Sequence, residues 1–121
     1  MTNTQQTFNG KKLLKNEVVV NGVLWDPDKI KDLLDRNDKA VCKAITVIYD
    51  YQTDSEKAMQ TTMEYNGVGF GGADVELLSS YAEGIKKYGG LTVKQMPYAR
   101  KKIKKYAKQL IRHMQRQQLG V

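Results

Sequence analysis

Residues 99–116 have an amphipathic helical pattern with two sharply different sides. On a helical wheel that advances about 100° per residue, the apolar side chains gather on one side: Ala99, Ile103, Tyr106, Ala107, Leu110 and Met114. The basic side chains gather on the opposite side: Lys101, Lys104, Lys105, Lys108, Arg112 and Arg116. A helix of this kind buries its apolar side, and the apolar stripe within residues 75–85 is the natural partner. The pattern predicts a continuous row of cations that faces solvent.

The positive charge of the chain is concentrated in this region. The net charge is +7, from 20 Lys and Arg against 13 Asp and Glu. Residues 93–121 contain nine of the basic residues and no acidic one, so residues 1–92 carry a net charge of −2. Solvated helix faces usually mix both signs, because opposite charges four residues apart stabilise a helix. We therefore expect a polyanionic partner, with plain solvation of the helix as the alternative.

The N-terminal part of the chain predicts a β-hairpin within residues 17–25. Asn21-Gly22 separates two apolar runs, and this dipeptide favours a type I′ turn, in which both central residues adopt positive φ. The preceding residues 1–10 are polar, so a flexible arm is expected there. A two-stranded hairpin is marginal alone, so it should pack on helices or pair with a second copy of the chain.

Helices are predicted for the rest of the chain. Asp26-Pro27 is typical of a helix start. A second helix should run from Asp38 to about Tyr51, although residues 45–49 are also compatible with a strand. The capping box from Thr53 to Glu56 then predicts a third helix from Asp54 to about Tyr65.

The last two predicted helices have clearer boundaries. Asp74 begins one of them as its N-cap, and Gly89-Gly90 ends it. A capping box from Thr92 to Gln95 opens the final, basic helix, and Pro97 either bends that helix or delays its start. We expect a single domain over residues 1–121 that is mainly α with an N-terminal β-hairpin, an α+β chain whose helical region at 27–118 forms a small bundle.

A glycine-rich segment at residues 66–72 precedes the Asp74 helix. It matches the spacing G-x-G-x-x-G, but no apolar strand comes before it and no Lys-Ser or Lys-Thr follows, which argues against a dinucleotide site and a P-loop. No cofactor is therefore expected. The backbone N–H groups of the loop could still hold an anion, and Phe70 could stack on a base or anchor the loop to the core. The candidate loop residues are Asn66, Gly67, Gly69, Gly71 and Gly72.

Catalytic and metal-binding patterns are weak, so a non-enzymatic protein is expected. His113 has no Cys or carboxylate at ligand spacing, which argues against a metal site. Cys42 is the only cysteine and is expected to be a small buried residue. The acidic edge formed by Asp26, Asp28, Asp32 and Asp35 would suit a metal-dependent nuclease, but solvation of a surface helix is the favoured interpretation. The chain has no long apolar run and no secretory leader is expected, so we assign it to the cytoplasm, that of the host cell if it is phage-encoded.

Four short segments together resemble a module of phage and prophage proteins. They are Tyr49-x-x-Gln52-Thr53-x-x-Glu56, Asn66-Gly67-Val68-Gly69-Phe70-x-x-x-Asp74-x-x-x-Leu78-Ser79-Ser80, Gly90-Leu91-Thr92-x-Lys94-Gln95 and Arg100-Lys101-Lys102-Ile103-x-Lys105-Tyr106-x-x-Gln109-Leu110. Similar segments accompany helicase-like and single-strand-binding proteins. The likeness covers residues 45–110 and departs at Pro97. It implies a small helical module linked to DNA processing, and it also suggests phage proteins that disarm host defence.

The sequence thus favours a small phage-type accessory protein that binds nucleic acid through its basic helix without catalysis. The alternative is an antagonist of host defence, which would block a CRISPR complex or sequester a cyclic or ADP-ribose-type nucleotide. A homo-oligomer formed through the hairpin is a third hypothesis, and a membrane surface is a weak one. Candidate binding residues for nucleic acid or a nucleotide are Phe70, Lys94, Arg100, Lys101, Lys104, Lys105, Lys108 and Arg112.

Overall fold

Two short antiparallel hairpins form the N-terminal part of the computed structural model, which describes residues 7–8, 10–58 and 69–118. Strand β1 (Thr7–Phe8) pairs with β2 (Lys11–Lys12). Part of the segment expected to be a flexible arm is therefore paired as a strand. Strand β3 (Val18–Val20) pairs with β4 (Val23–Trp25).

The β3–β4 hairpin has the predicted turn. Asn21 has φ 51° and Gly22 has φ 78°, so both central residues adopt the positive φ that a type I′ turn needs. The hairpin packs on helix α5 (Ala107–Gln118), and Val18 is buried there. Gln115 of α5 also donates hydrogen bonds to the carbonyl oxygens of Lys15 and Glu17, each at 3.0 Å. The helical region thus supplies the packing partner that the hairpin requires.

Helix α1 (Pro27–Arg36) begins where the sequence predicted. The Asp26 carboxylate accepts a hydrogen bond of 2.8 Å from the backbone N–H of Lys29, and Pro27 occupies the first turn, where its missing N–H costs nothing. Helix α2 (Asp38–Ala58) follows after Asn37.

The predicted break after Tyr51 is wrong, because α2 continues without interruption through Thr53 and Glu56 to Ala58. No glycine or proline stands between Asp38 and Ala58, so nothing stops the helix from propagating. The competing strand at residues 45–49 is excluded by the same helix. The remainder of the predicted third helix, residues 59–65, lies outside the described residues.

The C-terminal half contains α3 (Val75–Tyr88), α4 (Met96–Ile103), the 3₁₀ turn η2 (Lys104–Tyr106) and α5. Gly89 ends α3 at φ 87°, in the left-handed conformation expected of a helix C-terminus. The Thr92–Gln95 capping box is confirmed: the backbone N–H of Thr92 donates to the Gln95 side chain at 3.0 Å, and that of Gln95 donates to the Thr92 hydroxyl at 3.1 Å. Because α4 starts at Met96, Pro97 lies in its first turn and disrupts no helical hydrogen bond.

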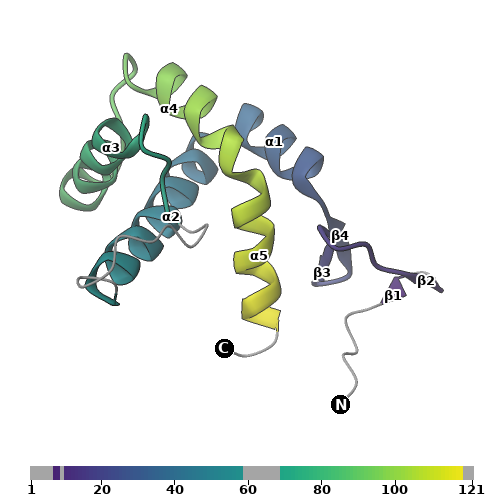
Figure 1. Cartoon of the computed structure of the whole chain (residues 1–121). Coiled ribbons are helices and arrows are strands. Elements are labelled where there is room, and N and C mark those ends of the chain that lie inside the picture. The colour runs from purple at the N-terminus through teal and green to yellow at the C-terminus, as the bar shows by residue number, and fades with distance from the viewer. Residues whose placement is uncertain (1–6, 9, 59–68, 119–121) are drawn as a thin grey trace.

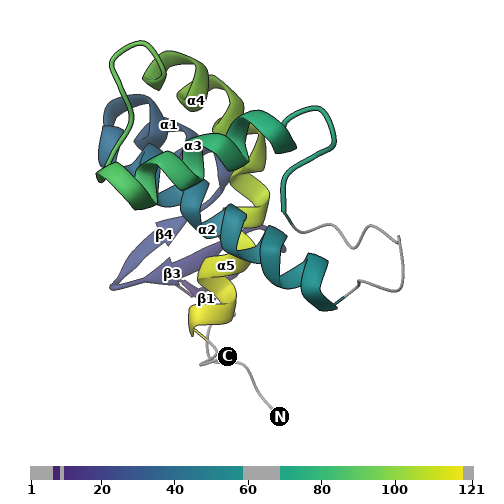
Figure 2. The same ribbon diagram turned by 90° about the vertical axis from the view of Figure 1, so that its left-hand side faces the viewer.

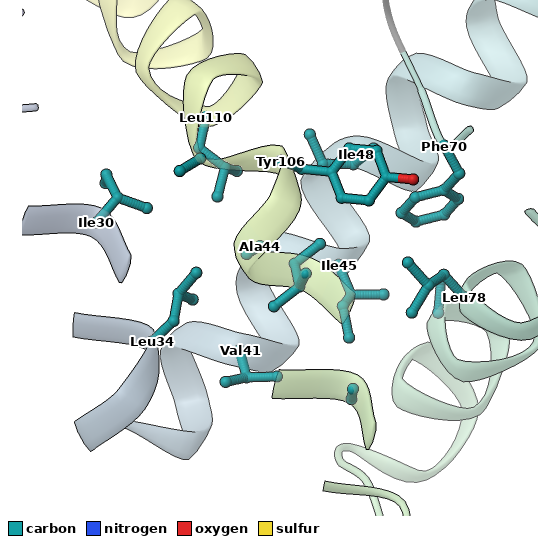
Figure 3. Close-up of a cluster of buried hydrophobic side chains, with 14 of the residues drawn as sticks. Ile30, Leu34, Val41, Ala44, Ile45, Ile48, Phe70, Leu78, Tyr106 and Leu110 are labelled. Atoms are coloured by element: carbon teal, nitrogen blue, oxygen red, sulfur yellow. The ribbon is translucent and has the colours of Figure 1, made fainter. Parts of the chain in front are cut away.

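Helix α2 lies at the centre of the fold and contacts α1, α3, α4 and α5 (Figures 1 and 2). Its buried residues Ile45 and Ile48 meet Leu78 of α3 and Tyr106 of η2 in the core (Figure 3). The mainly helical class with an N-terminal hairpin is therefore confirmed. Within the described ranges, no helix combines the length and the apolar character needed to cross a membrane.

Candidate nucleic-acid interface

Four basic side chains form an exposed line along α4, η2 and α5, which we call the cationic row: Lys101, Lys105, Lys108 and Arg112. They stand at spacings of four, three and four residues, which places consecutive members on one side of a helix. The opposite side is fully buried at Ala99, Ile103 and Ile111. The two-sided pattern that the sequence predicted is therefore present, but its apolar side packs mainly on α1, α2 and β3, and the predicted partner at residues 75–85 is wrong.

The predicted row was too long, because Lys104 and Arg116 contact other parts of the fold, and the candidate binding residue Arg100 does so as well. Arg100 pairs with Asp38 and donates from Nε to the carbonyl oxygen of Leu34 at 2.7 Å. Lys104 Nζ lies 2.7 Å from Asp35 Oδ1. The acidic end of α1 and the first residue of α2 pack beside α4 and η2, and they neutralise these two cations. The row of solvent-facing cations is therefore shorter than predicted where α4 and η2 pack beside α1 and α2.

The basic region is also not one straight helix. The 3₁₀ turn η2 stands between α4 and α5, and the two helices run in different directions (Figure 1). A 3₁₀ turn is wound more tightly than an α-helix, so it changes the direction of the chain without ending the helical path. Tyr106 within η2 and Ala107 directly after it are both buried. The cationic row therefore follows a bent path, while its apolar side stays in the core.

At the C-terminal end of the basic region, the side chains of Arg116 and His113 contact Tyr51 of α2. The Arg116 guanidinium lies 4.7 Å from the centre of the Tyr51 ring, and its Nε donates to the Tyr51 hydroxyl at 3.3 Å. That hydroxyl lies 2.7 Å from His113 Nδ1. Burial, together with the charges of Arg116 and Lys43, lowers the pKa of His113, which favours the neutral imidazole at neutral pH. Arg116 and His113 thus hold α5 on α2.

The glycine loop is fastened to the helices by its backbone. The N–H and the carbonyl of Gly69 form a pair of hydrogen bonds with the Gln109 amide, at 3.0 Å and 2.9 Å. The N–H of Phe70 donates to Gln52 Oε1 at 2.8 Å, and that of Gly71 donates to the Tyr106 hydroxyl at 2.8 Å. These three N–H groups therefore have partners within the chain, and the expectation that they would hold an anion is not supported at residues 69–71. Asn66 and Gly67 lie outside the described residues.

Phe70 is an anchor of the core and not a stacking platform. Its side chain is only 4% exposed and meets the Tyr106 ring edge to face, with ring centres 5.7 Å apart (Figure 3). Of the two interpretations of Phe70, the anchor is confirmed and the stacking of a base is wrong, because the ring lies within the protein. Tyr106 is buried as well, with 7% of its surface exposed, as its place on the apolar side of the helical pattern predicted.

Asp74 joins the loop to the cationic row. Its side chain is 4% exposed and accepts hydrogen bonds from the Tyr106 hydroxyl at 2.8 Å and from Lys105 Nζ at 2.7 Å. Lys102 Nζ lies 3.4 Å from the other carboxylate oxygen. Burial by itself would raise the pKa of Asp74, but the hydrogen bonds from Lys105 and Tyr106, together with the nearby Lys102 ammonium, outweigh it and lower the pKa.

Asp74 therefore occupies the N-cap position of α3 without capping it through its side chain. Its carboxylate instead holds Lys105 in place within the row.

No family model, curated protein or solved structure matches this chain. The site is therefore interpreted from its own geometry.

Gln52, Tyr106 and Gln109 are the site residues that sequence reasoning missed. Nothing in the local spacing of these three residues indicates that they share one loop as a partner. Lys94, by contrast, was predicted as a binding residue and lies exposed in the turn before α4, apart from the loop.

The remaining residues that were considered for catalysis or metal binding are dispersed or take part in structural contacts. Asp26 caps α1 and Asp32 pairs with Arg36 at 2.8 Å, while Asp35 pairs with Lys104. Cys42 is half-buried, and burial raises the pKa of its thiol. Among the described residues, no three His, Cys, Asp or Glu side chains lie close enough to share a metal ion.

Proposed function

We propose that this protein binds nucleic acid without catalysing a reaction, and that the cationic row is the surface that contacts phosphates. The observation that carries the proposal is the exposure of Lys101, Lys105, Lys108 and Arg112 on one side of a helical path whose other side is buried. Only Lys105 of the four has a carboxylate partner among the described residues. We place this activity in the cytoplasm.

The electrostatics of the row suit a phosphate backbone. Residues 93–121 contain no acidic side chain, so no negative charge within that region opposes an approaching polyanion. Lysine and arginine side chains on a regular surface can each contact one phosphate and release its condensed counterions. Such contacts position a protein on nucleic acid and carry no base specificity. The proposed activity is therefore general binding that depends strongly on salt.

The first prediction concerns this salt dependence. If the three residues of the row without a carboxylate partner, Lys101, Lys108 and Arg112, each neutralise one phosphate of duplex DNA, log K should fall with log[salt] with a slope of about −2.7. Fluorescence anisotropy with a labelled duplex, measured over a series of salt concentrations, gives the slope directly. Absent or salt-insensitive binding would contradict the proposal.

A pair of matched variants assigns the slope to the row. The triple variant K101Q/K108Q/R112Q should bind weakly and bring the slope close to zero, since each lost contact reduces it by about one. The control K31Q/K39Q/K43Q removes the same charge from exposed positions of α1 and α2. It should keep the wild-type slope, and an equal loss in both variants would mean that only the net charge matters.

The alternative hypothesis, an antagonist of host defence, predicts a different result for the same wild-type and variant proteins. A protein that sequesters a cyclic or ADP-ribose-type nucleotide should show a rise in melting temperature with that nucleotide, and its oligonucleotide binding should be unaffected by the triple variant. A thermal-shift series with such nucleotides therefore separates the two hypotheses.

A further inference from the structure

Tyr98 is an exposed aromatic side chain at the N-terminal end of the cationic row. It lies in the first turn of α4 and its side chain is 64% exposed. No hydrogen bond or ring contact to another described residue holds it. The ring of Tyr98 is therefore accessible to a ligand.

The helix places Tyr98 beside the cations. Lys101 and Lys102 follow at three and four residues, so their side chains flank Tyr98 on the surface of α4. Lys105, the next member of the row, stands one further turn along the chain. Ala99 and Ile103, which point into the core, fix the rotation of α4 and keep Tyr98 on the outside. The aromatic ring and the row therefore form one continuous surface.

Most other aromatic side chains of the described region contact the rest of the fold. Phe70 and Tyr106 are buried against each other, and Tyr51 lies between Arg116 and His113. Tyr88 at the end of α3 is 75% exposed, but Lys87 lies over its ring at 5.3 Å. Tyr98 is thus the aromatic residue that combines an open ring with neighbouring row cations.

We infer that the cationic row and Tyr98 together take single-stranded nucleic acid in preference to a duplex, with Tyr98 stacking on an unpaired base. The inference rests on the proposed function and names its ligand class. In a duplex, the faces of the bases are covered by their neighbours, so an exposed tyrosine beside the phosphates gains nothing. In a single strand, bases can turn out and stack on the ring, while the lysines follow the backbone.

The test compares two ligands and two tyrosines. Wild type, Tyr98→Ala and Tyr88→Ala are titrated with oligo(dT) of about 16 nucleotides and with a duplex of equal phosphate number. Tyr98→Ala should weaken single-strand binding about fivefold or more and duplex binding less than about twofold, because stacking contributes at least about a factor of five per base. Tyr88→Ala should behave as wild type, and Tyr98→Phe should keep the single-strand affinity because it keeps the ring.

A second measurement detects the contact itself. Irradiation of the complex with oligo(dT) that carries 5-iodouracil should cross-link a base to Tyr98, which mass spectrometry of the digested protein would identify. Equal losses for both ligands in Tyr98→Ala, or no loss for either, would overturn the stacking inference while the salt dependence of the row stands. Failure of the proposed function is a separate result, in which wild type binds neither ligand.

Discussion

Replacing Gly69 with alanine is expected to lower the free energy of unfolding by about 2–4 kcal/mol. Gly69 has φ 88°, a conformation that side chains with a Cβ rarely adopt. An added Cβ would lie 2.5 Å from Gln52 Oε1 and 3.1 Å from the Gln52 Cα. Gln52 would have to move, and Phe70 would lose the hydrogen bond that its N–H donates to that oxygen. Urea unfolding followed by circular dichroism gives the change.

Gly72→Ala is the matched control for this prediction, because Gly72 belongs to the same loop. A Cβ on Gly72 would have no atom within 4 Å, and Gly72 does not have a positive φ. Its replacement should change the free energy of unfolding by less than about 0.5 kcal/mol. Equal effects of the two replacements would mean that the fastening of Gly69 to Gln52 and Gln109 contributes little to stability.

Replacing Asp74 with asparagine should remove about 2 kcal/mol of stability at pH 7, because two charge-assisted hydrogen bonds become weaker. The loss should depend on pH. The folded protein lowers the pKa of Asp74, so the carboxylate contributes its full stabilisation above its unfolded pKa of about 3.9. That contribution disappears as the pH falls through the lowered folded pKa. The difference between wild type and Asp74→Asn should therefore shrink in acid, as measured by urea unfolding from pH 7 to about pH 2.5.

Asp32→Asn makes the same change of charge at an exposed ion pair. Asp32 and Arg36 lie four residues apart on α1, and both side chains are mostly in solvent. Such pairs contribute at most about 1 kcal/mol, so the control should differ little from wild type at every pH. A stability difference for Asp74→Asn that stays constant into acid would show that the ionised carboxylate is not its source.

The elements that could be predicted from the sequence are those set by residues close together in the chain. The Asn21-Gly22 turn, the Asp26 cap and the Thr92–Gln95 box each act over at most three positions, and all are found in the structure. The buried side of residues 99–114 was also predictable from its period. The burial of Ile111 was not predicted. Helix α5 contacts α1, α2 and β3, so it is buried over a wider part of its surface than a single apolar stripe covers.

The features that could not be predicted depend on contacts between distant residues. Lys104 meets Asp35 across 69 positions, and Gln109 meets Gly69 across 40. A helical wheel treats one helix alone, so it counts Lys104 as a solvent-facing cation. For Phe70 the sequence left base stacking and anchoring both open, and its contact with Tyr106 decides for the anchor. For the same reason, the Thr53–Glu56 pattern predicted a helix start although the surrounding residues continue α2.

Because the amide of Gln109 holds both backbone groups of Gly69, the basic segment is not a detachable tail. Residues 96–118 supply core side chains such as Ile103 and Ile111, and they also carry the partners of a loop that precedes them by some forty residues. Grafted onto an unrelated protein, this stretch would transfer its positive charge without its curvature. A synthetic peptide of the same sequence would likewise be a poor mimic of the intact surface, since an isolated helix of this size is marginal in water.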